Sequence, residues 1–129
     1  MKKSDIHILV VDDDKSIRIL MTEAIQRLGF KVSAVASPVE AETLSKIKTV
    51  HFAIIDCMLP VINGVDLAKK LPQTHLKNVP IVLISGIFKD KQFEQEALSK
   101  SKAIKFYTKP FAIEKILNDI KENTAPLLD

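Results

Sequence analysis

The sequence has a single cysteine, only three glycines and no tryptophan among its 129 residues. Cys57, being alone, cannot form an internal disulfide, and chains without disulfides are typical of a reducing compartment. We therefore expect a cytoplasmic protein. The low glycine content, together with 47% hydrophobic residues, is typical of a folded domain rather than a disordered or fibrous chain.

Long apolar runs and strong charge are also missing. The longest apolar segments are far too short to cross a bilayer, so we expect no membrane-spanning segment. The formal net charge is +3, whereas proteins that bind nucleic acid usually carry a concentrated basic face. We therefore expect neither a membrane nor a nucleic acid as a partner.

What the sequence does contain is a regular alternation of strand and helix patterns. Strands are predicted at 6–11, 31–36, 52–56, 80–85 and 103–108, and helices at 16–28, from 38, after 64, at 90–100 and from 113. In the first helix the apolar stripe includes Leu20, and in the second it consists of Ala41, Leu44 and Ile47. Gly29 is predicted to end the first helix, and Ser37 and Pro38 to begin the second.

Five strands alternating with five helices predict an α/β fold, a doubly wound five-stranded parallel sheet of the flavodoxin-like type. The chain shows no repeat and no change of composition. We expect one domain over 1–129, with its core from about 5 to 123 and a frayed tail from 124 onward.

Polar residues stand where four of the predicted strands end. Asp12 and Asp13 follow the first strand, Asp56 ends the third, Ser85 ends the fourth and Lys109 follows the fifth. Because the carboxyl ends of parallel strands share one edge of the sheet, these side chains should converge. Three carboxylates would repel one another unless a cation lies among them, and oxygen ligands favour Mg²⁺. The edge is thus predicted to combine a metal site, a nucleophilic carboxylate and groups that hold phosphoryl oxygens.

Several polar residues fit structural roles. Asp14 is predicted to be the N-cap of the first helix rather than a metal ligand. Cys57 fits a buried structural thiol, and the three histidines lack the spacing of zinc ligands. The lysines between positions 89 and 109 are mostly expected to form a solvated face.

Four motifs occur in order, each at the end of a predicted strand. They are Val10-Val11-Asp12-Asp13-Asp14, then Asp56-Cys57-Met58-Leu59-Pro60 with Asn63-Gly64, then Ser85-Gly86, and finally Thr108-Lys109-Pro110-Phe111. Any one of them is weak evidence, but all four in sequence are specific. With these motifs the chain resembles the receiver domains of two-component response regulators over nearly its whole length, in a single-domain form similar to the chemotaxis regulators.

The resemblance implies a phosphoryl-transfer site. Asp56 would accept a phosphoryl group from a phosphohistidine on a sensor histidine kinase or a phosphotransfer protein. Lys109 would pair with Asp56 and later with a phosphoryl oxygen, Ser85 would donate its hydroxyl to another, and the bond from Lys109 to Pro110 would be cis. Such chemistry needs positioning and charge neutralisation more than covalent help.

The resemblance also implies a Mg²⁺ cofactor. Asp13 would bind the ion directly, Asp12 largely through water, and Asp56 and the backbone carbonyl of Met58 would complete the protein ligands.

The residues that would pass on the signal depart from the pattern that is usual in the receiver family. Phe106 stands where the family often has a Tyr switch that acts with Ser85, and Tyr107 should point to the opposite face. No glycine precedes the last strand, in the run 99–103.

The resemblance also implies how the signal would be passed on and how it would end. An unidentified downstream protein would bind the face formed by the helix at 90–100, the last strand and the last helix. Met58 and Ile87 are apolar where polar groups can orient hydrolytic water, which predicts slow autodephosphorylation.

Two other functions fit parts of the pattern. One is a pseudo-receiver, an interaction module that uses the fold without phosphorylation. The other is a phosphatase of the haloacid dehalogenase type, which needs its nucleophile on the first strand and usually a cap insertion that 129 residues leave no room for. The complete set of site residues favours the phosphorylated receiver, which is a signalling domain rather than an enzyme.

Overall fold

The computed structural model describes residues 1–59, 63–74, 77–86 and 91–129. The strands are β1 (His7–Val11), β2 (Lys31–Val35), β3 (Phe52–Asp56), β4 (Ile81–Ser85) and β5 (Lys105–Thr108). The helices are α1 (Lys15–Arg27), α2 (Pro38–Ile47), α3 (Gly64–Thr74), α4 (Lys91–Ser101) and α5 (Ile113–Thr124), with 3₁₀ turns η1 (Lys3–Asp5) and η2 (Ala125–Leu127). Of the helices described, none is long and apolar enough to cross a membrane.

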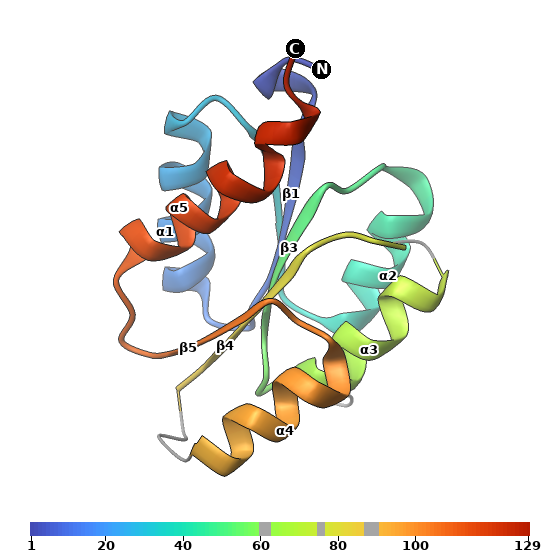
Figure 1. Cartoon of the computed structure of the whole chain (residues 1–129), viewed down its shortest axis with the longest axis vertical. Coiled ribbons are helices and arrows are strands. Elements are labelled where there is room, and N and C mark those ends of the chain that lie inside the picture. The colour runs from blue at the N-terminus through green and yellow to red at the C-terminus, as the bar shows by residue number, and fades with distance from the viewer. Residues whose placement is uncertain (60–62, 75–76, 87–90) are drawn as a thin grey trace.

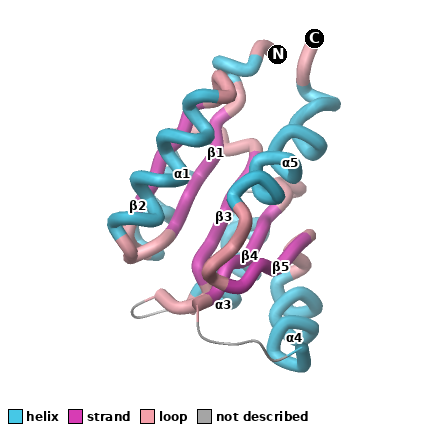
Figure 2. Tube along the Cα trace, turned by 90° about the vertical axis from the view of Figure 1, so that its left-hand side faces the viewer, coloured by secondary structure: helices cyan, strands magenta, loops and turns pink. Residues whose placement is uncertain are grey.

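The five strands form one parallel sheet in the order β2-β1-β3-β4-β5. Helices α1 and α5 cover one face of the sheet, and α2, α3 and α4 cover the other (Figures 1 and 2). Strands β1, β3 and β4 are buried along their whole length, as expected for the centre of a parallel sheet. The predicted doubly wound α/β fold is confirmed.

Each face of the sheet has its own hydrophobic core. On one side Met21 and Ile25 of α1 and Ile116 of α5 pack against β1, β3 and β4. On the other side Ala41, Leu67 and Ala97, from α2, α3 and α4, pack against the alternate residues of the same strands. Successive residues of a strand point to opposite faces, so each central strand contributes to both cores.

Two residues of the predicted apolar stripes lie outside these cores. Ile47 is 74% exposed and Leu20 is 44% exposed. In α2 the buried positions are Pro38, Ala41 and Ser45, so the core-facing side of the helix is rotated away from Ile47. The prediction for Ile47 and Leu20 was wrong because apolar character at helical spacing does not fix the rotation of a helix on the sheet.

The helix ends agree with the predicted caps. The Asp14 carboxylate accepts a hydrogen bond from the backbone N–H of Ser16 at 2.9 Å, which confirms its role as N-cap of α1. Ser37 caps α2, and Pro38 is its first residue. Gly29 follows α1 with φ of +97°, a left-handed conformation that glycine adopts without strain.

At the end of α4 a lysine stands where glycine is usual, and the end of the chain differs from expectation. Lys102 follows α4 with φ of +61°, so a lysine occupies a left-handed position where glycine is usual. The tail is not frayed: residues Ala125–Leu127 form a 3₁₀ turn, Thr124 is fully buried, and Leu128 packs on the core. The two chain ends also meet, since the Asp129 N–H donates to the Met1 carbonyl at 3.1 Å (Figure 1).

Candidate functional site

The predicted site lies at the carboxyl edge of the sheet. Asp12 directly follows β1 and Asp56 is the last residue of β3, and these two strands are neighbours in the sheet. From β1 the chain goes on to β2 on one side of this pair, and from β3 it goes on to β4 on the other side. The direction in which strands are added to the sheet therefore reverses between β1 and β3. Such a reversal is the usual place for a ligand site in an open α/β sheet.

Three aspartates form an acidic cluster at this edge. One carboxylate oxygen from each of Asp12, Asp13 and Asp56 lies within 4.8 Å of the other two. Asp12 is fully buried and Asp56 is 3% exposed, whereas Asp13 faces solvent. Hard oxygen donors with one open side fit Mg²⁺, which usually keeps several waters in its coordination shell. The residues present therefore fit the predicted ion.

Lys109 joins the two buried carboxylates. Its Nζ lies 2.9 Å from Asp12 Oδ2 and 3.1 Å from Asp56 Oδ2. Burial alone would lower the pKa of Lys109, but the hydrogen bonds and charges of Asp12 and Asp56 outweigh it and raise that pKa. Lys109 thus stays a cation. The peptide bond from Lys109 to Pro110 is cis, as the resemblance implied.

The surroundings of Asp56 disfavour the ionised form of its carboxyl group. Burial raises the pKa of its carboxyl above the usual value, and the nearby charge of Asp12 acts in the same direction. The N–H of Met58, which donates to Asp56 Oδ1 at 3.0 Å, and the ammonium of Lys109 act against this rise. The negative charge of Asp56 is therefore only partly compensated by the protein, and a further cation would stabilise it.

Ser85 supplies a buried hydroxyl that no other described residue engages. Its Oγ is buried and has no hydrogen-bond partner within the described part of the chain. The residue ends β4, between Asp56 on β3 and Lys109 after β5, and its carbonyl accepts the N–H of Lys109 at 2.8 Å. Leaving a buried hydroxyl unpaired costs about 1–3 kcal/mol, which an incoming oxygen acceptor would recover.

Backbone contacts that the sequence did not reveal hold the aspartates in place. Arg18 of α1 donates from Nη1 to the carbonyl of Asp12 at 2.9 Å. Gly64, the first residue of α3, packs directly on the chain at Asp56, because a Cβ placed on it would lie 1.8 Å from the Asp56 carbonyl oxygen. An Asn-Gly pair indicates a turn, but no local pattern shows what that turn touches.

The family model for the response regulator receiver domain matches residues 8–121. The chain belongs to this family. It is 30% identical over 114 residues to the alkaline phosphatase synthesis transcriptional regulatory protein PhoP of Bacillus subtilis (strain 168), a match that covers 88% of this chain and 46% of PhoP. It is 31% identical over 115 residues to the regulatory protein VirG of Agrobacterium tumefaciens (strain 15955), covering 89% of this chain and 42% of VirG. The receiver domain thus spans less than half the length of either relative.

Solved receiver domains have the same architecture. The BeF3-activated DrrB receiver domain superposes with a TM-score of 0.81 at 25% identity, covering 97% of this chain and 99% of that one. The chemotaxis response regulator CheY4 of Vibrio cholerae gives 0.81 at 25% identity, covering 92% and 98%. Receiver domains are signalling domains of two-component systems that interact with histidine kinases or phosphotransfer proteins.

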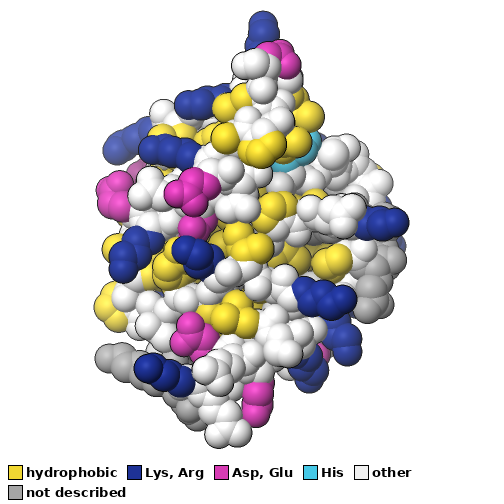
Figure 3. Space-filling view, in the orientation of Figure 1, with side chains coloured by type: hydrophobic (Ala, Val, Ile, Leu, Met, Phe, Trp, Pro, Cys, Tyr) yellow, Lys and Arg dark blue, Asp and Glu magenta, His cyan; other side chains and the backbone are white. Residues whose placement is uncertain are grey.

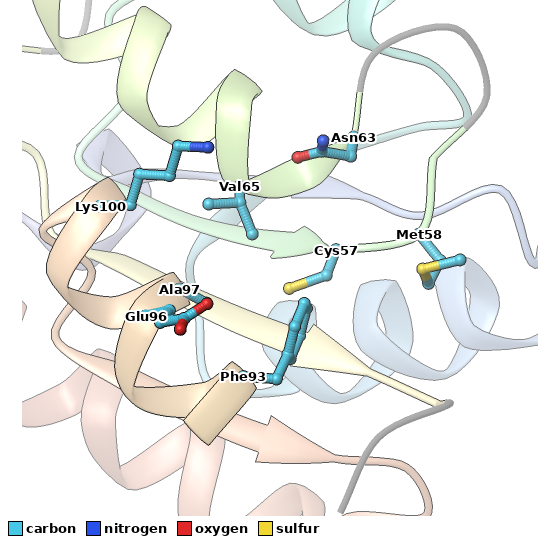
Figure 4. A pocket seen from close by; sticks show the side chains of 8 residues that line it. All are labelled: Cys57, Met58, Asn63, Val65, Phe93, Glu96, Ala97 and Lys100. Carbon is cyan, nitrogen blue, oxygen red and sulfur yellow. The ribbon is translucent and has the colours of Figure 1, made fainter. Parts of the chain in front are cut away.

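Next to the acidic cluster, the receiver domain has a small pocket between α3 and α4. It has a volume of about 250 Å³ and is lined in part by Cys57, Val65 and Phe93 (Figure 4). Burial raises the pKa of the Cys57 thiol to about 12, so the thiol stays protonated and unreactive, as predicted for a structural cysteine. Met58 lies at the same pocket with its side chain 44% exposed, and Ile87 lies outside the described residues.

Phe106 and Tyr107 lie on opposite faces of β5, as predicted. Phe106 is 9% exposed and meets the ring of Phe93 on α4 edge to face, with ring centres 5.9 Å apart. Tyr107 packs on the other face and donates its hydroxyl to Asp119 of α5. Lys105 also pairs with Asp119, at 3.4 Å. Strand β5 is thus connected to α4 by a ring contact and to α5 by a hydrogen bond and an ion pair.

Proposed function

We propose that Asp56 accepts a phosphoryl group from a phosphohistidine of a sensor histidine kinase or a phosphotransfer protein. The observation that carries this proposal is the pairing of a buried Asp56 with Lys109 at 3.1 Å, beside the Ser85 hydroxyl, which has no hydrogen-bond partner among the described residues. A carboxylate nucleophile, a fixed cation and a free hydroxyl donor are the groups that a transferring phosphoryl requires.

In the transfer, a carboxylate oxygen of Asp56 forms a bond to phosphorus while the bond from phosphorus to the imidazole nitrogen breaks. The nitrogen keeps the electron pair of that bond, and Asp56 becomes an acyl phosphate. Lys109 is placed to pair with one phosphoryl oxygen, and Ser85 to donate a hydrogen bond to another. Mg²⁺ held by Asp12, Asp13, Asp56 and the Met58 carbonyl would offset the negative charge of carboxylates and phosphoryl oxygens.

Labelling with a small phosphodonor tests the nucleophile. The unmodified receiver domain should gain one phosphoryl group from acetyl phosphate in the presence of Mg²⁺, measured by intact mass, and Asp56→Asn should gain none. Asp66→Asn is the matched control, because Asp66 is a partly exposed carboxylate on α3, the helix that follows Asp56, and lies outside the acidic cluster. Labelling that survives Asp56→Asn, or an unmodified protein that accepts neither acetyl phosphate nor BeF3, would remove Asp56 from this role.

We also propose that the signal leaves through the face formed by α4, β5 and α5. A hollow of about 320 Å³ lies on this face, between Glu94 of α4, Tyr107 of β5 and Lys115 of α5. Phe106 lines this hollow and packs inward on Phe93. A tyrosine at position 106 would have to bury its hydroxyl in this inward arrangement, at a cost of about 1–3 kcal/mol. The inward arrangement is therefore accessible before phosphorylation.

The change Phe106→Tyr tests this pathway. We expect larger amide NMR shift changes in α4 and β5 upon addition of BeF3 to the variant than to the unmodified protein, because the variant starts from a smaller inward population. Shift changes confined to α1 in both proteins would contradict the proposed face. Slow loss of phosphate remains part of the proposal, and phosphate release after removal of the donor measures it.

A further inference from the structure

A separate cavity lies at the opposite edge of the sheet from Asp56. It has a volume of about 420 Å³ and is formed by the C-terminal ends of α3 and α4 and by the segment that leads into β4. Four lysines line it: Lys69, Lys77, Lys100 and Lys102. Figure 3 shows Lys and Arg side chains gathered on the lower right of the molecule, where Figure 1 shows α3 and the end of α4.

The positive charge of this cavity is poorly compensated. No Asp or Glu is among the described residues that line it. Lys100 pairs with Asp66 at 3.6 Å, but within the described ranges no carboxylate lies within ion-pair distance of the other three lysines. Like charges around a hollow repel one another, so an anion placed between them would lower the electrostatic free energy.

The remaining walls indicate the class of anion. Val79 and Ile81 give the cavity an apolar wall, and Asn78 adds a side-chain amide. The volume lies within the range of small-molecule sites, which are mostly apolar with a few polar groups. Lysine binds phosphate as a point charge, whereas recognition of a single carboxylate favours the two-pronged arginine, which the described lining does not contain.

We propose that this cavity, here called the lysine cavity, binds a small molecule with two or more phosphoryl groups, such as a nucleoside polyphosphate. The lysines contact the phosphoryl oxygens, and a ring system packs on Val79 and Ile81. Ile81 begins β4 and Ser85 ends it, so the lysine cavity and the phosphorylation site lie at opposite ends of the same strand. Binding there is therefore separate from phosphoryl transfer to Asp56.

The lysines also have a structural role that the experiment has to separate from binding. Carbonyl groups at the ends of α3 and α4 carry partial negative charge, which attracts nearby lysines even without a ligand. Loss of a lysine can therefore lower thermal stability while the cavity stays empty. Affinity for an anion is the quantity that a purely structural role would not change.

The test is a calorimetric titration of the whole chain with pyrophosphate and with ATP, in EDTA so that no metal brings phosphate to the acidic cluster. We expect saturable binding, with amide NMR shift changes centred on Lys77, Asn78 and Lys102. The double change Lys77→Gln with Lys102→Gln should weaken binding at least tenfold. Asp56→Asn should leave the affinity unchanged.

The matched control is Lys46→Gln with Lys121→Gln, which removes the same charge from exposed positions on α2 and α5. This control should change the affinity less than twofold. An equal loss in both double variants would mean attraction by net charge alone and would overturn the proposal. Absence of binding at millimolar pyrophosphate, or tighter binding of an oligoglutamate peptide than of ATP, would overturn it as well, the latter in favour of an acidic protein partner.

Discussion

The three consecutive aspartates after β1 differ in what surrounds each of them. Asp12 is buried, accepts the N–H of Asp14 at 2.8 Å and pairs with Lys109. Asp13 faces solvent and belongs to the acidic cluster. Asp14 caps α1, and hydrogen bonds from the Ser16 hydroxyl and N–H lower the pKa of its carboxyl. Three consecutive aspartates therefore have three different roles: an ion pair with Lys109, a solvent-facing carboxylate of the acidic cluster, and the N-cap of α1.

This difference gives a prediction for Asp13 with Asp14 as its control. Asp13→Ala should weaken Mg²⁺ binding roughly tenfold or more, because it removes the solvent-facing carboxylate of the cluster. Asp14→Ala should leave Mg²⁺ affinity nearly unchanged and lower the free energy of unfolding by about 1 kcal/mol, the usual cost of losing an N-cap. Calorimetric Mg²⁺ titration and urea unfolding measure the two effects. Equal Mg²⁺ affinity of Asp13→Ala and the unmodified protein would exclude Asp13 as a ligand.

At the scale of elements, the connection from β3 to α3 decides where Asp56 lies. The N–H of Gly64 donates to the carbonyl of Cys57 at 2.9 Å, so the start of α3 folds back onto the end of β3. A side chain at Gly64 would collide with backbone atoms of Asp56 and Cys57, which cannot move without displacing the nucleophile. Close approach, rather than an unusual φ, is what requires glycine here.

Gly64→Ala should therefore destabilise the domain by about 1–3 kcal/mol, in the range found for overpacked sites. It should also slow phosphoryl labelling, because the chain at Asp56 has to shift. Gly86→Ala is the control, since among the described residues a Cβ there would meet only the Lys109 side chain, at 3.6 Å, an ordinary contact. We expect less than about 0.5 kcal/mol from the control. Urea unfolding gives the free energies, and a Gly64→Ala protein as stable and as quickly labelled as Gly86→Ala would disprove the close approach.

At the scale of the whole molecule, the edge opposite the phosphorylation site contains a second set of titratable groups. The backbone N–H of His7 donates to Nδ1 of His51 at 3.0 Å, and Nε2 of His7 lies 2.7 Å from the Ser33 hydroxyl. Burial lowers the pKa of both histidines, and the charge of Lys48 lowers that of His7 further. The folded state thus holds both imidazoles neutral.

This arrangement predicts that stability falls with acidification. An unfolded chain takes up protons on His7 and His51 as the pH falls through 6.5, and the folded protein takes them up only at lower pH. The free energy of unfolding should therefore decrease between about pH 7 and 5.5, measured by urea midpoints. His7→Gln with His51→Gln should flatten this part of the profile. Histidine NMR titrations with pKa values at or above 6.5 would contradict the prediction.

The raised pKa of Asp56 changes the free energy of unfolding with pH in the opposite direction to the histidines. The folded state favours its protonated form more than the unfolded state does, so Asp56 adds stability as the pH falls toward and below its folded pKa. Asp56→Asn should remove this contribution and make the acid loss steeper. The two ends of the sheet thus respond to pH in opposite directions.

The sequence by itself determined the strand and helix alternation, the parallel sheet and the identity of the residues at the strand ends. These follow from local features, namely hydrophobic periodicity and polar residues that stop an apolar run. Asp14, Ser37 and Gly29 were predictable for the same reason, because a cap acts on its own helix within a few residues.

Only the tertiary structure decided which side of each helix is buried and which atoms meet. Ile47 is exposed, Gly64 touches Asp56, and Lys109 reaches Asp56 across 53 residues of sequence. The lysine cavity likewise joins residues from α3, α4 and the segment before β4. Such contacts depend on the rotation of helices on the sheet and on distances between distant segments, and neither leaves a pattern in neighbouring residues.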